Sequence, residues 1–177
     1  MFFAFYIFAI WFYSHRLKKQ PITGNIVSAT LTVTPFFAIF IYYQNFEKVI
    51  FAHALFLFLL VSMRELTKDL ENIKGDLALN YRTVPVVYGE ITSKLMLSVV
   101  AVFTIVTAIA LILFFKIGYM YYFFYLSVML LVVFLLILWK SNKKTHYLLL
   151  HNILKFIIVL GVFSILLIDI SVVLNRI

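Results

Sequence analysis

The chain has 177 residues, of which 65% are hydrophobic and only 12% are charged, and its formal net charge is +8. A water-soluble domain carries about twice that charged fraction, so the composition excludes a soluble globular domain and indicates an integral membrane protein. We interpret the positive charge as a topology signal, because cytoplasmic loops of membrane proteins collect Lys and Arg, and we expect no nucleic-acid partner. The absence of cysteine excludes disulfides and thiolate metal sites.

The first 13 residues are apolar, but at about 1.5 Å per residue a helix of that length is shorter than the hydrocarbon core. Longer apolar runs follow, close to the roughly 20 residues that a spanning helix needs. The predicted spans are Ile26–Tyr43, Val49–Met63, Leu95–Phe115, Tyr119–Trp139 and Leu148–Leu174. The sequence therefore predicts an all-α integral membrane bundle of six helices, the first of half length, in a single transmembrane domain over residues 1–177.

Pro35 lies inside the first full span and should kink it, because proline removes a backbone N–H from the helix. The carbonyl that this frees must find another donor inside the membrane. We expect the donor to come from a neighbouring helix or from a nearby threonine such as Thr34.

Basic residues gather in three connecting segments, residues 14–25, 64–94 and 140–147, which hold 11 of the 15 Lys and Arg residues. With six consecutive helices these segments fall on one face of the bundle. The positive-inside bias places that face, including the 64–94 loop, in the cytoplasm. We expect a bacterial inner (cell) membrane, with membrane lipids as partners. His151, near the cytoplasmic end of the last span, is expected to reach the lipid headgroups.

Five of the seven acidic residues lie between Glu65 and Glu90. At 100° per residue, four oxygen-bearing side chains of this segment share a helical face about 60° wide, unless Gly75 ends the helix first. They are Glu65, Asp69, Asn72 and Asp76. Mg²⁺ prefers oxygen ligands and is often held by one or two carboxylates and substrate phosphates. Spacing alone favours a solvated segment in which Arg64, Lys68 and Lys74 pair with Glu65, Asp69 and Glu71.

The run RELTKDLENIKGDLALNYRTVPVVYGE, residues 64–90, resembles the second aspartate-rich motif of the UbiA superfamily of intramembrane prenyltransferases. That motif reads R-E-x-x-K-D-x-x-D-x-x-G-D, followed by a basic residue, Thr, a hydrophobic residue and Pro. The earlier run Tyr13–Lys19, with Gly24 and Asn25 after it, resembles the family's tyrosine-and-lysine loop. The resemblance is closest to the geranylgeranylglycerol-phosphate geranylgeranyltransferase-like branch and covers essentially the whole chain.

The resemblance implies a fold of nine transmembrane helices, of which this chain holds about six. It also implies Mg²⁺-dependent transfer of a prenyl group from a prenyl diphosphate donor to a lipid-like or aromatic acceptor in the membrane. Carried over by position, it implies metal ligands at Asp69, Asn72 and Asp76. It implies diphosphate-binding side chains at Tyr13, Arg16, Lys18, Lys68 and Arg82.

The chain departs from the family pattern in two places. Asn72 stands where the family commonly has Asp, so this ligand brings no charge. The family's first motif, N-D-x-x-D-x-x-x-D, is absent from the 177 residues. We therefore expect an N-terminally truncated relative that is inactive by itself.

The sequence supports two other functions less well. The main alternative is a non-catalytic polytopic membrane protein, such as a transporter or a structural subunit. Proteins of that class usually place ionisable residues near mid-membrane, whereas here they gather in one connecting segment. A CDP-alcohol phosphotransferase is disfavoured because its carboxylate spacing does not occur in the chain.

Overall fold

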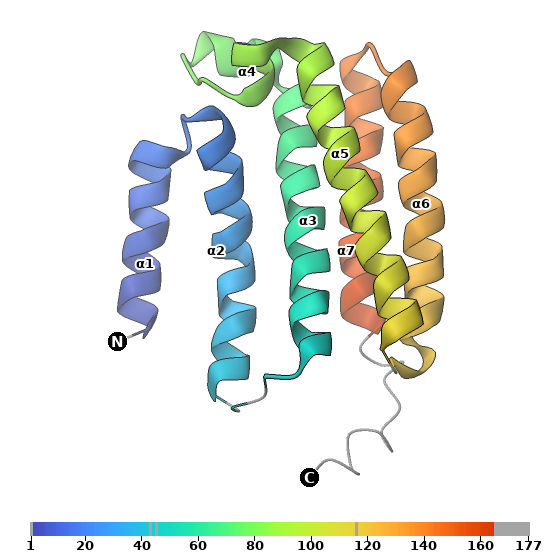
Figure 1. Ribbon diagram of the computed structural model, residues 1–177. Coiled ribbons are helices and arrows are strands. Elements are labelled where there is room, and N and C mark those ends of the chain that lie inside the picture. Colours follow the sequence, from blue (N-terminus) through green and yellow to red (C-terminus); the bar gives the residue numbers. More distant parts are fainter. Residues whose placement is uncertain (1, 43, 45, 116, 165–177) are drawn as a thin grey trace.

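A computed structural model describes residues 2–42, 44, 46–115 and 117–164 of the chain (Figure 1). These residues form helices joined by short turns, with no strand among them. The helices are α1 (Phe2–Phe12), α2 (Pro21–Tyr42), α3 (Lys48–Glu71), α4 (Ile73–Ala78), α5 (Val84–Phe114), α6 (Tyr121–Lys140) and α7 (Lys144–Ser164), with a π turn η1 (Tyr13–Leu17) and a 3-10 turn η2 (Gly118–Met120). Helices α2, α3, α5, α6 and α7 are long and apolar enough to cross a membrane. The chain is therefore an all-α integral membrane protein.

The predicted spans are found, but the helices are longer than the apolar runs that predicted them. Helix α3 continues to Glu71 instead of ending at Met63, and α5 begins at Val84 instead of Leu95. Apolarity marks only the part of a helix that meets the hydrocarbon. Hydropathy alone therefore predicts a loop where the polar turns of these helices continue. The last predicted span continues into residues 165–174, which lie outside the described residues.

Helix α5 is interrupted near its start. Gly89 has a backbone φ of +84° inside the helix, a conformation that residues with a Cβ rarely adopt. Val84 to Tyr88 form a first short segment, with Pro85 in its opening turn. The regular helix begins after Gly89, as expected because proline and glycine interrupt regular helices.

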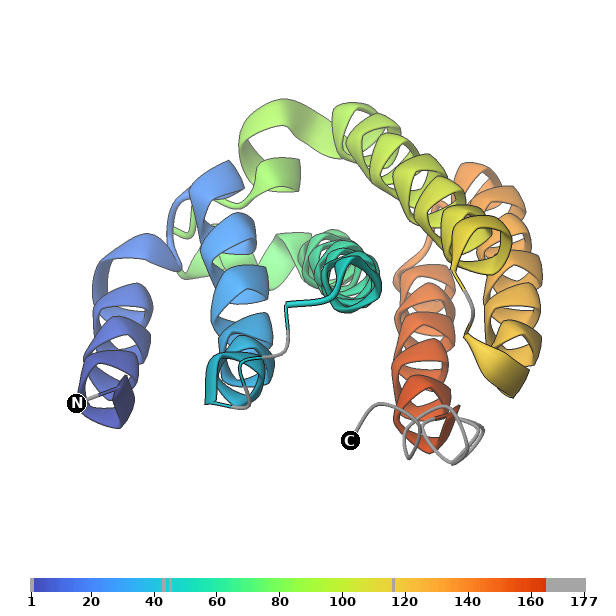
Figure 2. The same ribbon diagram turned by 60° about the horizontal axis from the view of Figure 1, so that its bottom comes forward.

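Helix α3 is the centre of the bundle. It packs against α2 on one side and against α5 and α7 on the other, and α6 completes the bundle by packing on α5 and α7. Figures 1 and 2 show α1 and α2 at one edge, with α1 outermost. The core lies among α3, α5, α6 and α7, where Leu60, Leu97, Phe124 and Leu154 are almost completely buried. Helix α1 buries none of its side chains.

The charged segments gather at one end of the bundle. The α1–α2 turn, α4 with the loop after it, and the α6–α7 turn all lie at the top of Figure 1. The α2–α3 and α5–α6 turns lie at the other end. The expectation that the three basic segments share one face is therefore confirmed. We call this face the charged end.

Pro35 sits inside α2 and leaves the carbonyl of Leu31 without its usual helical donor. The hydroxyl of Tyr6, on α1, donates a hydrogen bond to that carbonyl at 2.9 Å. Thr34 instead donates to the carbonyl of Thr30 at 2.7 Å. A neighbouring helix thus satisfies the freed group, and the same contact holds α1 against α2.

Candidate functional site

The charged end begins where α3 ends, at Asn72. Asn72 has φ −112° and ψ 19°, and its N–H bonds to the carbonyls of Lys68 and Asp69 at 3.1 and 3.2 Å. Asparagine is a poor interior helix residue because its side chain competes for backbone hydrogen bonds. The short helix α4 then carries Gly75 and Asp76. The predicted single helical face from Glu65 to Asp76 is therefore wrong, since the helix breaks before Gly75.

Asp69 and Asp76 nevertheless remain within electrostatic reach of each other. Asn25, in the first turns of α2, donates its Nδ2 to Oδ2 of Asp69 at 3.0 Å. Thr83, in the loop before α5, donates its hydroxyl to Oδ2 of Asp76 at 3.0 Å. Each half-buried carboxylate thus has one oxygen oriented by a neutral donor. Neither forms an ion pair with any of the described residues.

Glu65 behaves differently from these two aspartates. Its carboxylate lies 2.9 Å from the Arg64 guanidinium and 3.6 Å from Nζ of Lys68, and its side chain is only 11% exposed. The salt-bridged interpretation of the charge run therefore holds for Glu65. It does not hold for Asp69 or Asp76, and the nearly half-exposed Lys68 also acts electrostatically on Asp69.

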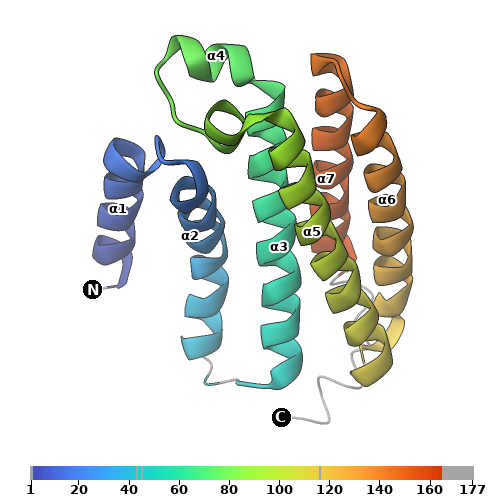
Figure 3. The ribbon, with the colours of Figure 1, turned by 45° about the horizontal axis from the view of Figure 1, so that its top comes forward.

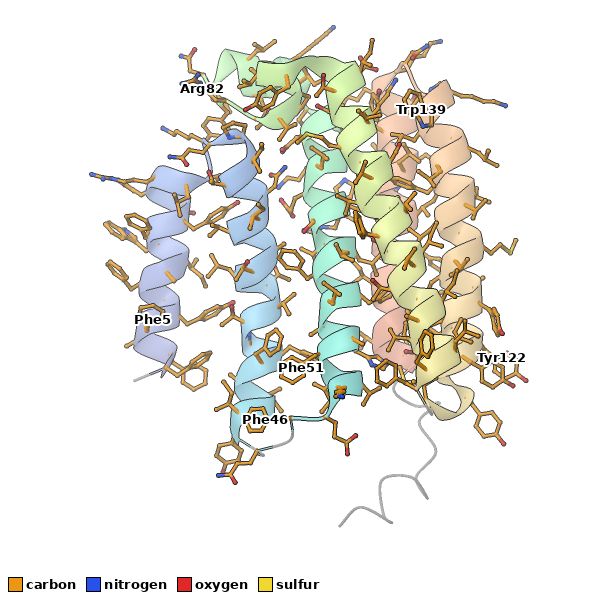
Figure 4. The ribbon with its side chains drawn as sticks, viewed as in Figure 1. Phe5, Phe46, Phe51, Arg82, Tyr122 and Trp139 are labelled. Carbon is orange, nitrogen blue, oxygen red and sulfur yellow. The ribbon has the colours of Figure 1, made fainter. Side chains whose placement is uncertain are left out.

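The α1–α2 turn meets the loop before α5, so two motifs that are distant in sequence come together (Figure 3). The N–H of Arg82 donates to the carbonyl of Lys19 at 3.1 Å. Nζ of Lys18 and of Lys19 lie 5.9 and 5.8 Å from the centre of the Tyr81 ring, a cation–π arrangement. Figure 4 places Arg82 at this end of the bundle.

Gly24 lets the α1–α2 turn pack closely onto the start of α2. A Cβ at this position would lie 3.0 Å from the carbonyl oxygen of Leu17, which is tighter than most real Cβ contacts. The close packing places the neighbouring Asn25 beside Asp69. Asn25 lies in the motif that indicated this loop, but nothing in the sequence indicates its contact with Asp69.

Two predicted residues are less closely tied to this cluster. Tyr13 and Arg16 belong to η1 at the charged end. The carbonyl of Tyr13 accepts the N–H of Lys18 at 2.9 Å, and the Arg16 side chain is exposed. No hydrogen bond or ion pair among the described residues joins either side chain to Asp69 or Asp76.

The cluster fits a partial magnesium site. No three His, Cys, Asp or Glu side chains gather closely enough among the described residues to enclose a metal by themselves. Mg²⁺, however, commonly uses one or two carboxylates and takes its other ligands from substrate phosphates and water. Asp69 and Asp76 supply hard oxygen donors of that kind. Asn72, at the helix break between them, carries only a neutral amide oxygen.

Glu71 points away from this cluster. Its Oε2 lies 3.0 Å from Nδ1 of His151 on α7, and the two side chains are 14% and 13% exposed. The expectation that His151 reaches the headgroups is therefore wrong, because its side chain turns inward to Glu71. The pair ties the end of α3 to α7 on the side opposite α2.

The model of the UbiA prenyltransferase family matches residues 1–156. A digeranylgeranylglyceryl phosphate synthase from Thermococcus sibiricus is 38% identical over 125 residues, which is 66% of this chain and 42% of that protein. The proteins of the same name from Pyrococcus furiosus and Methanopyrus kandleri are each 36% identical, over 63% and 56% of this chain and 39% and 35% of their own lengths. The chain thus spans about two fifths of the length of these curated relatives. No solved structure matches it.

Proposed function

The chain belongs to the UbiA prenyltransferase family, and we propose that its charged end is one half of a site for prenyl transfer. The reaction moves a prenyl group from a prenyl diphosphate to a lipid-like acceptor in the membrane. One observation carries the proposal: Asp69 and Asp76 lie within electrostatic reach of each other and have no ion-pair partners among the described residues, whereas Glu65 is paired. Family membership disfavours the alternative of a non-catalytic transporter or structural subunit.

We propose Mg²⁺ as the cofactor, held by Asp69 and Asp76 with the amide oxygen of Asn72 as a neutral third donor. When bound, Mg²⁺ stabilises the negative charge that develops on the departing diphosphate. Asn25 and Thr83 orient the two carboxylates before the donor arrives. This preorganisation spares the site a costly rearrangement during the reaction.

The bases of the charged end complete the proposed diphosphate site. Lys68, beside Asp69, and Lys18 and Arg82, where the two loops meet, neutralise the phosphate oxygens. Tyr13 and Arg16 lie at its edge, on the α1–α2 turn. Their charge and hydrogen-bonding groups fit the outer oxygens of a diphosphate that is bound between the two loops.

The bond between the allylic carbon and the diphosphate oxygen breaks, and its electron pair leaves with the diphosphate. The apolar helices shield the resulting allylic cation from water. The hydroxyl oxygen of the acceptor then forms the new bond to carbon and releases its proton. This chain's own contribution is to hold the donor's diphosphate at the charged end while the prenyl chain lies among the helices.

The relatives are named digeranylgeranylglyceryl phosphate synthases. We therefore propose a geranylgeranyl diphosphate donor and a glyceryl phosphate acceptor that already carries one geranylgeranyl chain, with an aromatic acceptor as the alternative. We further propose that the charged end faces the cytoplasm, because it holds most of the basic residues. The membrane is then the cell membrane.

The experiment uses a chimera in which residues 1–177 replace the matching region of the Thermococcus sibiricus relative. Membranes receive Mg²⁺, labelled geranylgeranyl diphosphate and geranylgeranylglyceryl phosphate, and the labelled lipid product is measured. We expect product from the chimera and little from residues 1–177 alone, which contain only one of the two carboxylate motifs. Asp69→Ala and Asp76→Ala should each lower the rate by about 10²–10³, the cost of removing one preorganised electrostatic contact.

Glu47→Gln is the matched control, because it removes a carboxylate at the opposite end of the bundle. Its rate should equal that of the unmodified chimera. Unchanged rates in both aspartate variants would contradict the metal assignment. Clear turnover by residues 1–177 alone would contradict the need for a first motif.

A further inference from the structure

A second basic site lies at the corner between α6 and α7. A cavity of about 250 Å³ at this corner is lined by Leu136, Ile137, Lys140 and His146. The two polar side chains lie at the charged end, and the two apolar ones lie about one helical turn nearer the middle of the bundle. We propose that this corner binds an anionic phospholipid, with its phosphate at Lys140 and His146 and its acyl chain along Leu136 and Ile137. The proposal is independent of the transfer site.

The charge of the corner favours an anion. Lys140, Lys143 and Lys144 are all exposed, and none of them forms an ion pair with the described residues. Residues 136–147 contain no Asp or Glu. Basic pockets between membrane helices bind anionic headgroups at the cytoplasmic surface. Water-exposed lysines also attract such headgroups over about a Debye length.

The depth of the corner in the membrane fits a lipid. Trp139 precedes Lys140 and lies at the same end of the bundle as Arg82 (Figure 4), and its side chain is 54% exposed. Exposed tryptophans mark the membrane–water interface. Leu136, one turn deeper, is 64% exposed and faces outward from the bundle. The cavity therefore reaches from the headgroup level into the hydrocarbon.

The cavity is open toward the membrane side and encloses no whole molecule, because its volume is only about 250 Å³. It can hold a phosphate group and the adjoining part of one acyl chain. The rest of a phospholipid would remain in the bilayer, where the outward-facing side of α6 is open to it.

A buried network holds the corner in one shape. Nζ of Lys94 donates to the carbonyl of Ser141 at 2.5 Å and lies 2.9 Å from the Glu90 carboxylate. The hydroxyl of Tyr147 donates to the same carboxylate at 2.5 Å and lies 3.3 Å from the same carbonyl. Ser141 is completely buried. The network fixes the turn that joins α6 to α7, and with it the backbone that carries Lys140 and His146.

Trp139 is a natural reporter for this corner, because the only other tryptophan is Trp11 in α1. The 177-residue chain carrying Trp11→Phe is reconstituted in phosphatidylcholine vesicles. Dibrominated phosphatidylglycerol or dibrominated phosphatidylcholine is then introduced at equal mole fractions, and quenching of Trp139 is measured. We expect the anionic lipid to bind preferentially, by about fivefold for each basic group that contacts it.

The double variant Lys140→Gln/His146→Gln should remove most of the preference and leave only the weaker attraction of Lys143 and Lys144. Lys140→Arg should keep the full preference, and so should Lys74→Gln, which removes a lysine from α4 at the same end. Millimolar inorganic phosphate should leave the preference unchanged. Equal quenching by the two lipids would overturn the proposal, and so would a preference that the double variant leaves undiminished. If Lys74→Gln loses the preference, the lipid responds to the general charge of this end and not to the corner. If inorganic phosphate removes the preference, the corner binds a free anion and not a phospholipid. If the double variant does not fold, Lys140→Gln alone must lower the preference.

Discussion

Helix α3 separates two differently built parts of the molecule. On one side, α5, α6 and α7 enclose an apolar core, and their polar groups pair with one another. On the other side, α1 buries no side chain, and the buried hydrophobic side chains of α2 are Ala29 and Val33 within the described residues. A single hydrogen bond from Tyr6 joins α1 to α2, and one from Asn25 joins α2 to α3.

The difference shows how similar residue types serve different purposes at one end of a bundle. On the closed side, Lys94 is 8% exposed and its ammonium group contacts Glu90, Ser141 and Asn142. On the open side, Asp69 and Asp76 are each oriented by a neutral donor and have no ion-pair partner among the described residues. Polar groups that satisfy one another stabilise the fold, whereas groups left open are available to a ligand.

The largest expected effect contrasts these two clusters directly. Lys94→Met should lower the free energy of unfolding by about 3 kcal/mol, because it breaks the ion pair with Glu90. This value is at the lower end for a buried pair, since the Glu90 carboxylate is partly exposed and can regain water. Asp69→Asn should change it by no more than about 0.5 kcal/mol, since its surroundings are half open. Reversible unfolding of both variants in mixed detergent micelles, followed by circular dichroism, measures the contrast. Equal losses in the two variants would show that the open side is also structural.

A smaller loss is expected at the pair that joins α3 to α7. His151→Leu leaves the buried Glu71 carboxylate without a partner, which should cost about 2 kcal/mol of unfolding free energy. The double variant Glu71→Leu/His151→Leu should recover part of that loss, because replacing both partners by apolar groups removes the unpaired charge. The same unfolding measurement applies. A double variant less stable than His151→Leu would argue against the pair as the cause.

The five spans could be predicted because the bilayer imposes a length and an apolarity that local composition reveals. The helix ends could not, because the polar turns of α3 and α5 are held by distant partners, as in Glu71 with His151 and Lys94 with Ser141. These polar turns resemble a loop when only their hydropathy is considered. Tertiary contacts carry these helices beyond their apolar segments, whereas Asn72 ends α3 and Gly89 interrupts α5 near its start.

The candidate site was predictable in its residue types but not in its geometry. The motif indicated Asp69 and Asp76, and the structure brings them within electrostatic reach across a helix break that the regular spacing had not included. Asn25 stands 44 positions before Asp69, so no periodicity relates the two residues. Only the packing of α2 on α3 shows that Asn25, beside the tyrosine-and-lysine loop, orients a carboxylate of the aspartate-rich motif.

That contact yields a prediction about metal affinity. Asn25→Ala frees Oδ2 of Asp69 from its donor and should weaken Mn²⁺ binding by about tenfold, as the loss of a hydrogen bond to a metal ligand usually does. Titration of the 177-residue chain with Mn²⁺, followed by electron paramagnetic resonance of the free ion, measures the change. Thr23→Ala, two residues earlier on an exposed surface, is the matched control and should keep the original affinity. If Asn25→Ala binds Mn²⁺ as tightly as the unmodified chain, Asn25 does not position a metal ligand.

The smallest expected effect concerns how the open side is held together. Tyr6→Phe removes the hydroxyl on α1 that donates to the Leu31 carbonyl. The loss should cost about 0.6 kcal/mol of unfolding free energy, the average for a hydrogen bond between membrane helices. In a Pro35→Ala background the restored N–H of residue 35 can bond to the same carbonyl within α2. Tyr6→Phe should then cost almost nothing, and a double-mutant cycle of unfolding free energies measures the difference. An equal cost in both backgrounds would mean that Tyr6 stabilises α1 through its ring packing rather than by satisfying the carbonyl that Pro35 exposes.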